Sequence, residues 1–352
     1  MDISKIDQNF CLKTSVDRED IVWKRADEAP FVVYGAASST PYLRMPSEIA
    51  KTVSEGVSYL NSHTAGVRLR FRTDSQYIAI HCEWRMLEHM AHMPISGSSG
   101  FDLFAVQSDG KQALITRPFI PPTTASNGYD SIVDVRGEMT DYILNFPLYN
   151  GVEKLYIGVQ ADCKFETPAR YSNALPVVFY GSSITQGGCA SRPGNCYQNF
   201  LSRALDMDYI NLGFSGSAKA EDTMIEYLAS LEQSVFVCDY DHNAPSIEHL
   251  QNTHYKLYQA IRAHHPDLPY IMISKPDFRP TTNDIARREV IMESYQKALA
   301  NGDKQVYFID GGSMFTDEER DAHTVDGCHP NDLGFYRMAQ AIYSVLKRLL
   351  NK

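Results

Sequence analysis

The first half of the chain is patterned in short apolar runs, many of which alternate apolar and polar side chains. These runs, found between Ile21 and Cys163, include residues 67–71, 77–80, 101–106, 142–146 and 155–159. Turn-forming pairs such as Asp109-Gly110 and Pro121-Pro122 lie between them. Alternation with a period of two places the apolar side chains on one face of a strand. The pattern therefore predicts a mostly antiparallel β-sandwich.

From Pro176 onward the periodicity changes. Short apolar runs at residues 177–180, 209–212, 235–239, 270–274 and 306–310 predict buried strands. Between and after them, amphipathic helices are predicted near residues 197–205, 220–231, 247–264, 283–300 and 333–350. Five successive β-α units predict a parallel sheet with helices on both faces. Because the crossovers are expected to be right-handed, a flavodoxin-like three-layer α/β/α sandwich is the expected topology.

Composition and charge exclude several classes of partner. The chain has 352 residues, and 33 Lys+Arg against 43 Asp+Glu give a net charge of −10, which argues against nucleic acid or an anionic membrane as partner. No apolar run approaches the roughly 20 residues that span a bilayer, and the first residues lack an apolar signal-peptide core. The 7 cysteines are odd in number and form no Cys-x-x-Cys pair. We therefore expect a cytoplasmic protein with reduced thiols.

A serine-containing turn follows the first strand of the second half, with the sequence Gly181-Ser182-Ser183-Ile184-Thr185-Gln186-Gly187. Ligands of open α/β sheets bind beyond the carboxyl ends of the strands, so a serine in this turn is well placed to be a nucleophile. On this segment alone, a tight turn with a helix-capping serine is the simpler interpretation.

An Asp and a His lie three residues apart before the final predicted helix, in Asp326-Gly327-Cys328-His329-Pro330-Asn331. On a turn these two side chains can hydrogen-bond, and the carboxylate then orients an imidazole that accepts a serine proton. A turn-capping Asp beside a solvated His is the alternative.

Two further segments follow strands of the same predicted sheet. Residues 211–217 read Asn-Leu-Gly-Phe-Ser-Gly-Ser, and residues 239–245 read Asp-Tyr-Asp-His-Asn-Ala-Pro. A glycine N–H and an asparagine amide are the donors that acyl transfer needs around an oxyanion. Each segment alone is compatible with an ordinary β-turn or Asx turn. Four such segments at one edge of one sheet, in the order Ser, Gly, Asn, Asp-His, favour a hydrolytic site.

This constellation resembles the SGNH (GDSL-type) hydrolase superfamily over residues 176–350. The resemblance implies that Ser183 is the nucleophile, that His329 and Asp326 complete the triad, and that the oxyanion hole is formed by Ser183, Gly216 and Asn243. The family's Gly-Asp-Ser block is here Gly181-Ser182-Ser183, and its Gly-x-Asn-Asp block is here residues 241–244, with Ala in the last position. No cofactor and no metal are expected for this chemistry.

The first half carries a second resemblance. Gly100-Phe101-Asp102-Leu103-Phe104 is similar to the Gly-x-Asp-Leu-Tyr signature of a β-sandwich domain that precedes SGNH domains of this kind, with Phe104 in the Tyr position. The expected organisation is an all-β, jelly-roll-like sandwich over residues 1–170 and an SGNH hydrolase domain over residues 171–352. Proteins with this organisation resemble bacterial esterases that act on acetylated or otherwise acylated carbohydrates.

The resemblances imply a serine esterase whose partner is a small acylated substrate, a sugar or oligosaccharide ester with a short acyl group such as acetyl. Three alternatives stay open from the sequence: an acyltransferase with the same acyl-enzyme, a lipase of longer chains, and a carbohydrate-binding protein on an inactive scaffold. The sequence does not decide between a monomer and a homo-oligomer.

Three residues near the expected cleft are candidates for contacting the substrate. Asp277 and Phe278 follow the fourth strand at the functional edge and are candidates for lining the pocket, although Asp277 is equally suited to capping a turn. Residues 84–99 are expected to form an arm of the first domain that reaches over the active site, with Trp84 as a candidate substrate contact. His89 and His92, three residues apart on this arm, lack a clear third ligand for a metal, and Cys328 is interpreted as structural.

Overall fold

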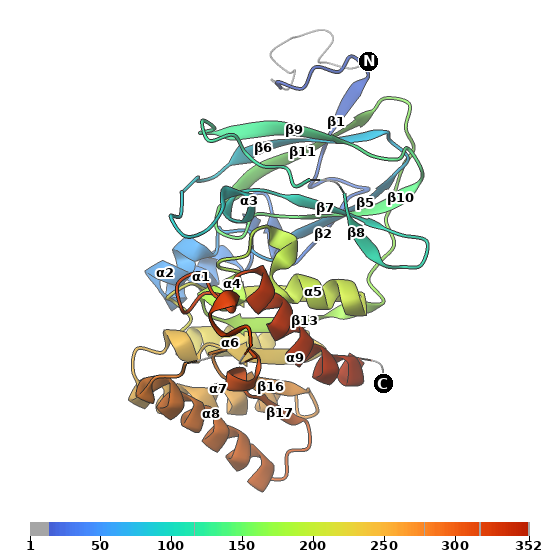
Figure 1. Ribbon diagram of the computed structural model, residues 1–352. Coiled ribbons are helices and arrows are strands. Elements are labelled where there is room, and N and C mark those ends of the chain that lie inside the picture. Colours follow the sequence, from blue (N-terminus) through green and yellow to red (C-terminus); the bar gives the residue numbers. More distant parts are fainter. Residues whose placement is uncertain (1–13, 116, 278, 317, 351–352) are drawn as a thin grey trace.

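The computed structural model describes residues 14–350, apart from residues 116, 278 and 317. Two antiparallel sheets form most of the first half (Figure 1). One has the order β1-β11-β6-β9, with β1 Ile21–Arg25, β6 Tyr77–Trp84, β9 Gly128–Asp134 and β11 Val152–Gln160. The other has the order β12-β5-β10-β7-β8, with β2 also paired to β5; its strands are β2 Val32–Tyr34, β5 Arg68–Thr73, β7 Asp102–Val106, β8 Gln112–Leu114, β10 Thr140–Asn145 and β12 Phe165–Glu166. A short pair is formed by β3 Ser38–Ser39 and β4 Tyr42–Leu43.

Alternate side chains of both sheets meet in one hydrophobic cluster. Leu69 and Phe71 of β5 belong to it together with Ile80 of β6 and Ile157 of β11. This agrees with the alternation that predicted paired antiparallel strands, because every second side chain of a strand points to the same face. The first half is not all-β as expected, however, since it also contains α1 Ser47–Val53, α2 Glu55–Leu60 and α3 Ile95–Ser98.

The second half is built on a parallel sheet with the order β14-β13-β15-β16-β17, in which every neighbouring pair is parallel. Its strands are β13 Asn173–Gly181, β14 Met207–Gly213, β15 Val235–Asp239, β16 Tyr270–Ile273 and β17 Val306–Ile309. The first strand in sequence is thus second in the sheet, which is the flavodoxin-like order that the β-α pattern predicted.

Helices cover both faces of this parallel sheet. The helices are α4 Ser183–Gln186, α5 Tyr197–Leu205, α6 Asp222–Ser230, α7 Ile247–His264, α8 Thr282–Ala300 and α9 Asp332–Leu350, with 3-10 turns at Pro193–Asn195, Asp241–Asn243, Gly311–Ser313 and Arg320–His323. Val177 and Phe179 of β13 pack into the hydrophobic cluster of α5 and α9, while Val178 and Tyr180 pack into the cluster of α6, α7 and α8. Burial on both faces explains why these strands read as continuous apolar runs.

The two halves share buried contacts. Arg44, which is almost fully buried, donates hydrogen bonds to the carbonyls of Gly213 at 2.5 Å and Leu60 at 2.6 Å. Arg68 of β5 pairs with Asp208 and lies over the ring of Tyr209, with its guanidinium carbon 3.7 Å from the ring centroid. Because a buried guanidinium must have partners for its N–H groups, these contacts fix the first half against the edge strand β14.

Within the described residues, the helices lack the length and apolar character that a membrane crossing requires. The six cysteines of the described part, Cys82, Cys163, Cys189, Cys196, Cys238 and Cys328, are free thiols.

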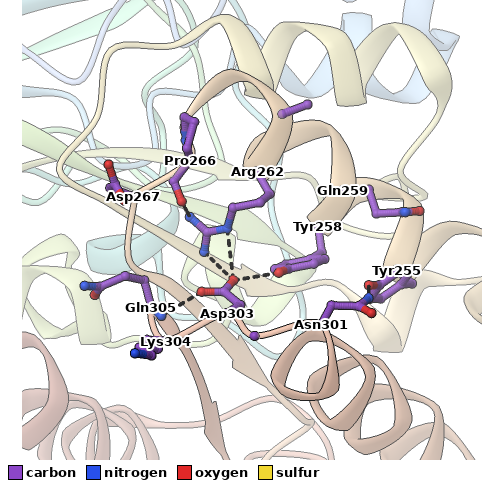
Figure 2. A pocket seen from close by; sticks show the side chains of 12 residues that line it. Tyr255, Tyr258, Gln259, Arg262, Pro266, Asp267, Asn301, Asp303, Lys304 and Gln305 are labelled. Carbon is purple, nitrogen blue, oxygen red and sulfur yellow. Dashed lines mark hydrogen bonds and ion pairs between the residues drawn. The ribbon is translucent and has the colours of Figure 1, made fainter.

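A cavity of about 680 Å³ lies at the edge of the parallel sheet that is opposite to the predicted functional edge (Figure 2). Its lining comes from the end of α7 and from segments that precede β16 and β17, so it lies at the amino ends of these strands. Asp303 closes part of it by accepting hydrogen bonds from Tyr258 at 2.6 Å and Arg262 at 2.9 Å. This cavity is therefore separate from the carboxyl edge, where the Ser183 turn lies.

Candidate active site

Ser182 and Ser183 have different roles at the turn after β13. The Ser182 side chain accepts a hydrogen bond from the backbone of Ile184 at 3.2 Å and caps α4, so the helix-capping interpretation is correct for Ser182. Ser183 is the first residue of α4, where backbone N–H groups have no intrahelical acceptor. Ser182 therefore caps the helix, and the hydroxyl of Ser183 is available to another partner.

That partner is His329. The Oγ atom of Ser183 lies 2.9 Å from Nε2 of His329, and Nδ1 of His329 lies 2.7 Å from Oδ2 of Asp326. Ser183 is 7% exposed, whereas the His329 and Asp326 side chains are partly open to solvent. The structure thus brings together the three residues assigned to the triad, which come from opposite ends of the second half. A nucleophile bonded to a base that is itself bonded to an orienting carboxylate is the arrangement that activates a serine.

Hydrogen bonds keep the Asp326 carboxylate ionised. Its partial burial by itself raises the pKa of Asp326, but hydrogen bonds from the backbone and ring of His329 and from the backbone of Cys328 outweigh burial and lower this pKa to about 2. The backbone donors lie at 2.7 Å for His329 and 3.0 Å for Cys328. A lowered pKa means that the charged carboxylate and its stabilising bonds are present above the ordinary Asp pKa and are lost only as the pH falls towards 2.

The segments that carry Gly216 and Asn243 are tied to the Ser183 turn. The Phe214 backbone amide donates to the carbonyl of Gly181 at 2.9 Å, and the Asn243 amide donates to the carbonyl of Phe214 at 2.8 Å. The Ser215 backbone amide donates to the side chain of Gln186 at 3.0 Å. An asparagine amide has two N–H donors, so this bond leaves one for a ligand.

The local backbone geometry favours glycine at two positions near Ser183. Gly216 has a φ of +68°, a conformation that favours glycine, and its N–H donates to none of the described residues. A Cβ atom on Gly181 would clash with the carbonyl of Asp239 and the hydroxyl of Thr185. Gly216 therefore presents a free backbone donor, and Gly181 allows the end of β13 to lie close to the end of β15 and to α4.

Several supporting residues had no signal in the sequence. Arg287 of α8 donates to the carbonyls of Asp241 at 2.5 Å and Ala244 at 2.9 Å, and so holds the turn that carries Asn243. Tyr149 of the first half donates to the carbonyl of Ser183 at 3.2 Å. Both residues are distant in sequence from the segments that they hold, so no local pattern identifies them.

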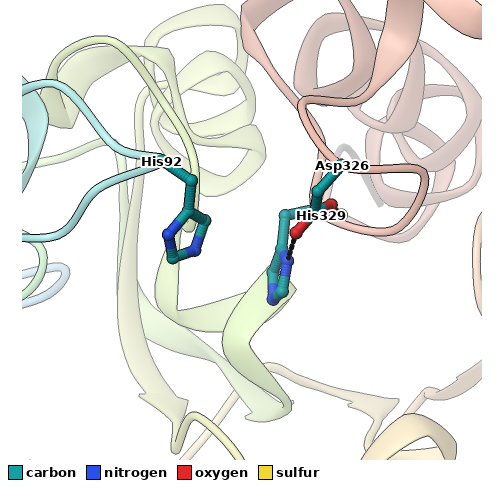
Figure 3. Close-up of side chains that lie close together, drawn as sticks. All are labelled: His92, Asp326 and His329. Atoms are coloured by element: carbon teal, nitrogen blue, oxygen red, sulfur yellow. Dashed lines mark hydrogen bonds and ion pairs between the residues drawn. The ribbon is translucent and has the colours of Figure 1, made fainter.

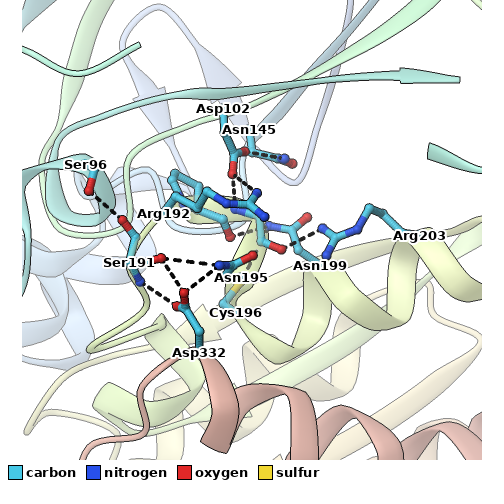
Figure 4. Close-up of polar contacts among 12 residues, drawn as sticks. Ser96, Asp102, Asn145, Ser191, Arg192, Asn195, Cys196, Asn199, Arg203 and Asp332 are labelled. Carbon is cyan, nitrogen blue, oxygen red and sulfur yellow. Dashed lines mark hydrogen bonds and ion pairs between the residues drawn. The ribbon is translucent and has the colours of Figure 1, made fainter. Parts of the chain in front are cut away.

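Asp102, from the Gly-x-Asp-Leu-Tyr-like motif, anchors the loop that follows α4 (Figure 4). Its side chain is fully buried; Oδ2 accepts hydrogen bonds from the Gly194 backbone at 2.7 Å and Arg192 at 2.9 Å, and Oδ1 accepts one from Asn145 at 2.8 Å. Ser191 of the same loop donates to Asp332 of α9 at 2.8 Å through its backbone. The motif therefore joins the first half to the loop that connects α4 with α5. This loop in turn contacts the first residue of α9, which lies three positions after His329.

The arm of residues 84–99 also reaches the site. The His92 ring centroid lies 5.7 Å from that of His329 (Figure 3). Ser96 donates to the carbonyl of Ser191 at 2.6 Å (Figure 4). Met93 packs in the same hydrophobic cluster as Ile184. One potential metal-binding atom from each of His92, Asp326 and His329 lies within 4.8 Å of the others.

Trp84 does not fit the role of a substrate contact. It is 8% exposed and packs in the core of the first half, with its ring centroid 5.3 Å from that of Tyr129. Trp84 is the last residue of β6 and points into the core between the sheets, so the arm begins only after it.

Asp277 has the turn-capping role that was its alternative interpretation. Its carboxylate accepts a hydrogen bond from the backbone of Arg279 at 2.8 Å and pairs with Lys275 at 2.9 Å. Phe278 lies outside the described residues.

The side chain of Cys328 contacts a second histidine, with its Sγ atom 2.9 Å from Nε2 of His242. Burial and the nearby Lys275 charge lower the pKa of His242 to about 4.

Two family models match the chain. Residues 174–347 match the GDSL-like lipase/acylhydrolase family, and residues 21–165 match the GxDLY family, described as the N-terminus of SGNH-hydrolase-type esterases. No curated protein matches the chain in sequence.

Solved structures are similar to the chain over most of its length. A protein from Bacteroides ovatus classed as a GDSL-like lipase is 28% identical with a TM-score of 0.84, covering 94% of this chain and 98% of that one. A salicylyl-acyltransferase from a tetracycline biosynthetic pathway is 19% identical with a TM-score of 0.77, covering 95% and 98%. An acetyl xylan esterase from the rumen bacterium Butyrivibrio proteoclasticus is 13% identical with a TM-score of 0.59, covering 94% and 99%. At these identities, the last two similarities show a shared fold alone.

Proposed function

Because this chain belongs to the GDSL-type (SGNH) hydrolases and is an ester-hydrolysing enzyme, we propose that it cleaves short acyl esters, above all acetyl esters, of carbohydrates through Ser183, His329 and Asp326. The observation that carries the proposal is the continuous hydrogen-bond chain from the Ser183 hydroxyl through His329 to Asp326.

The proposed reaction has two stages. His329 takes the hydroxyl proton of Ser183 as the Ser183 Oγ atom attacks the ester carbonyl. His329 then gives this proton to the departing alcohol. The tetrahedral oxyanion is held by the backbone N–H groups of Ser183 and Gly216 and by the Asn243 amide. A water molecule activated by His329 then hydrolyses the acyl-enzyme. Asp326 stabilises the imidazolium throughout, because its carboxylate stays charged.

We further propose that the chain divides near residue 170 into a β-sandwich domain and the hydrolase domain, a division supported by the ranges of the two family models. The sandwich is proposed to shape the cleft rather than to act as an independent module. The support is that Tyr149, His92 and Asp102 of the first half contact the Ser183 turn, His329 and the loop after α4.

The alcohol part of the substrate is proposed to lie in a cavity of about 890 Å³ beside α2. Tyr59 is 42% exposed on the wall of this cavity, and its ring centroid lies 5.3 Å from that of His63, whose Nδ1 is 3.1 Å from the Gln186 amide of α4. Gly56 of α2 abuts Ser217, the neighbour of Gly216. Tyr59 in the cavity wall is thus linked to α4 through His63, and α2 packs against the segment that carries Gly216. We propose that the exposed ring of Tyr59 offers a face to a sugar.

Replacing Asn243 with Ala should reduce kcat by about 100- to 1,000-fold with little change in KM, because the oxyanion forms only in the transition state. Steady-state kinetics with an aryl acetate measure both constants. Asn252→Ala, on the exposed side of α7, is the matched control and should leave kcat unchanged. A change confined to KM would mean that Asn243 binds substrate and that the oxyanion hole is built otherwise.

Replacing Tyr59 with Ala should raise KM for an acetylated xylo-oligosaccharide by about threefold to tenfold, the free-energy range of one aromatic contact. Hydrolysis of a small aryl acetate should change little, since its alcohol does not extend into the cavity. Tyr255→Ala, which alters the cavity at the opposite edge, is the control. Equal effects of Tyr59→Ala on both substrates would place the sugar elsewhere.

The experiment that tests the substrate class is a hydrolysis panel. Acetyl, butyryl and longer aryl esters are compared with acetylated xylan, acetylated mannan and mono-acetyl sugars, with and without sugar alcohols as acceptors. The proposal expects acetyl esters to be hydrolysed fastest. Transfer that exceeds hydrolysis would identify an acyltransferase, and a preference for long chains would identify a lipase.

A further inference from the structure

A second imidazole lies beside the proposed general base, on a segment from the other half of the chain. His92 and Asp326 are exposed, and His329 is half-buried. Figure 3 shows the His92 ring projecting from its loop towards the side of the His329 ring. The proposed acyl-transfer steps assign His92 no role, since the proton of Ser183 needs only one base.

We propose that His92 and His329 bind a divalent transition-metal ion of the Zn²⁺ or Cu²⁺ class, with Asp326 as the outer carboxylate that orients His329, and that this ion reversibly inhibits the enzyme. The inhibition rests on the proposed function, whereas the binding does not.

The distances suit an ion held between two histidines. The ring centroids of His92 and His329 are 5.7 Å apart with an angle of 55° between the rings, and one ligand atom of each of the three side chains lies within 4.8 Å of the others. Zn–N bonds of about 2.0 to 2.1 Å require the two nitrogens to move somewhat closer. His92 is an exposed side chain, so its ring can make this movement without disturbing the core.

The hydrogen bond between Asp326 and His329 orients the imidazole ring so that its Nε2 atom can bind a metal ion. Nδ1 of His329 lies 2.7 Å from Oδ2 of Asp326, and with the proton on this nitrogen the lone pair of Nε2 is available. A carboxylate that orients an imidazole in this way is the usual outer partner of a zinc-bound histidine. The Asp326 carboxylate lies directly behind His329 and so places a carboxylate close to the ion.

The ligand chemistry sets the selectivity of the site. Imidazole nitrogens suit Zn²⁺, Cu²⁺ and Ni²⁺, whereas Mg²⁺ and Ca²⁺ prefer sets of oxygen ligands. Binding uses the same Nε2 lone pair that otherwise faces the Ser183 hydroxyl at 2.9 Å. A bound ion therefore removes the general base, and the reaction stops until a chelator withdraws the metal.

The binding test uses the full-length Ser183→Ala protein, which keeps His92, His329 and the outer carboxylate Asp326 and removes turnover. Zn²⁺ is titrated in competition with a chromogenic chelator. Adding His92→Ala should weaken zinc binding by at least about tenfold, the smaller end of what losing even an outer partner of a zinc site costs. His92→Gln gives a second variant, and His89→Ala, three residues away on the same arm, is the matched control that should retain the affinity.

The inhibition test uses the catalytically competent chain and compares each variant with its own metal-free rate. Zn²⁺ should inhibit and EDTA should restore the rate, Mg²⁺ at the same concentration should not inhibit, and His92→Ala should require at least about tenfold more Zn²⁺. The proposal is overturned if zinc binding to the Ser183→Ala protein is absent or is the same with and without His92. An inactive chain that still binds zinc through His92 would refute the esterase proposal and leave the metal site standing.

Discussion

Replacement of Ser183 by Ala is expected to lower kcat by about a million-fold, the loss seen when the nucleophile of a triad is removed. His329 and Asp326 then have no alcohol to activate, so only the oxyanion donors and substrate binding remain. The Ser183 side chain caps no helix, and the substitution should leave the melting temperature close to that of the parent protein. The measurement is the steady-state hydrolysis of an aryl acetate, together with a thermal unfolding curve.

Ser182→Ala is the matched control at the neighbouring position. It removes the cap of α4 and should cost about 1 kcal/mol of stability, while the activity falls far less than in Ser183→Ala. If Ser182→Ala abolishes turnover and Ser183→Ala does not, the nucleophile has been assigned one residue too late.

Asp102→Ala is expected to lower the free energy of unfolding by about 3 kcal/mol, because it leaves the partly buried Arg192 guanidinium and the Gly194 amide without their acceptor. The loop of residues 188–196 then loses its buried anchor on β7 and keeps the Ser96–Ser191 hydrogen bond to the first half, so kcat should fall as well. Urea unfolding of the full chain and kinetics on the same preparation measure the two effects.

The control for this prediction is Asp109→Ala, which removes an exposed carboxylate paired with Lys111 at 2.9 Å. Exposed pairs of this kind contribute about 0 to 1 kcal/mol, so its unfolding curve should barely move. An Asp102→Ala protein that unfolds like the parent protein would mean that the two halves are joined without this anchor.

The sequence predicted the second half well because its signals are local and periodic. The strand at Val235–Asp239 and the helices at Tyr197–Leu205 and Ile247–His264 have the predicted bounds, since continuous apolar runs and helical spacing belong to each segment by itself. The Ser183 turn and the Asp326-His329 pair were identifiable for the same reason. Their spacing is fixed by one turn each, and the parallel sheet brings both turns to one edge.

Other features depend on contacts between distant residues. Helices α1 and α2 have only 7 and 6 residues, and Ala50, Val57 and Leu60 are held by the hydrophobic cluster of the second half. Isolated helices of this length are not stable in water and depend on tertiary packing, so the local sequence pattern does not predict them. The partners of Asp102 lie about 90 positions away at Arg192 and Gly194.

Trp84 shows the opposite error, in which a residue type suggested a role that its position does not allow. Aromatic side chains stack on sugars, but they also fill cores, and an alternating strand sends one side chain in two inward. Trp84 is on the inward side of β6, whereas the exposed Tyr59 lies on α2, a helix that was not predicted.

The most direct test of the proposed chemistry is to label the chain with a fluorophosphonate, which reacts much faster with an activated serine than with ordinary hydroxyl groups, and to map the modified residue by mass spectrometry. We predict a single label on Ser183, loss of esterase activity in proportion to labelling, and no label in His329→Ala. A label on another residue, or full ester hydrolysis by a protein that the reagent has failed to modify, would contradict the account.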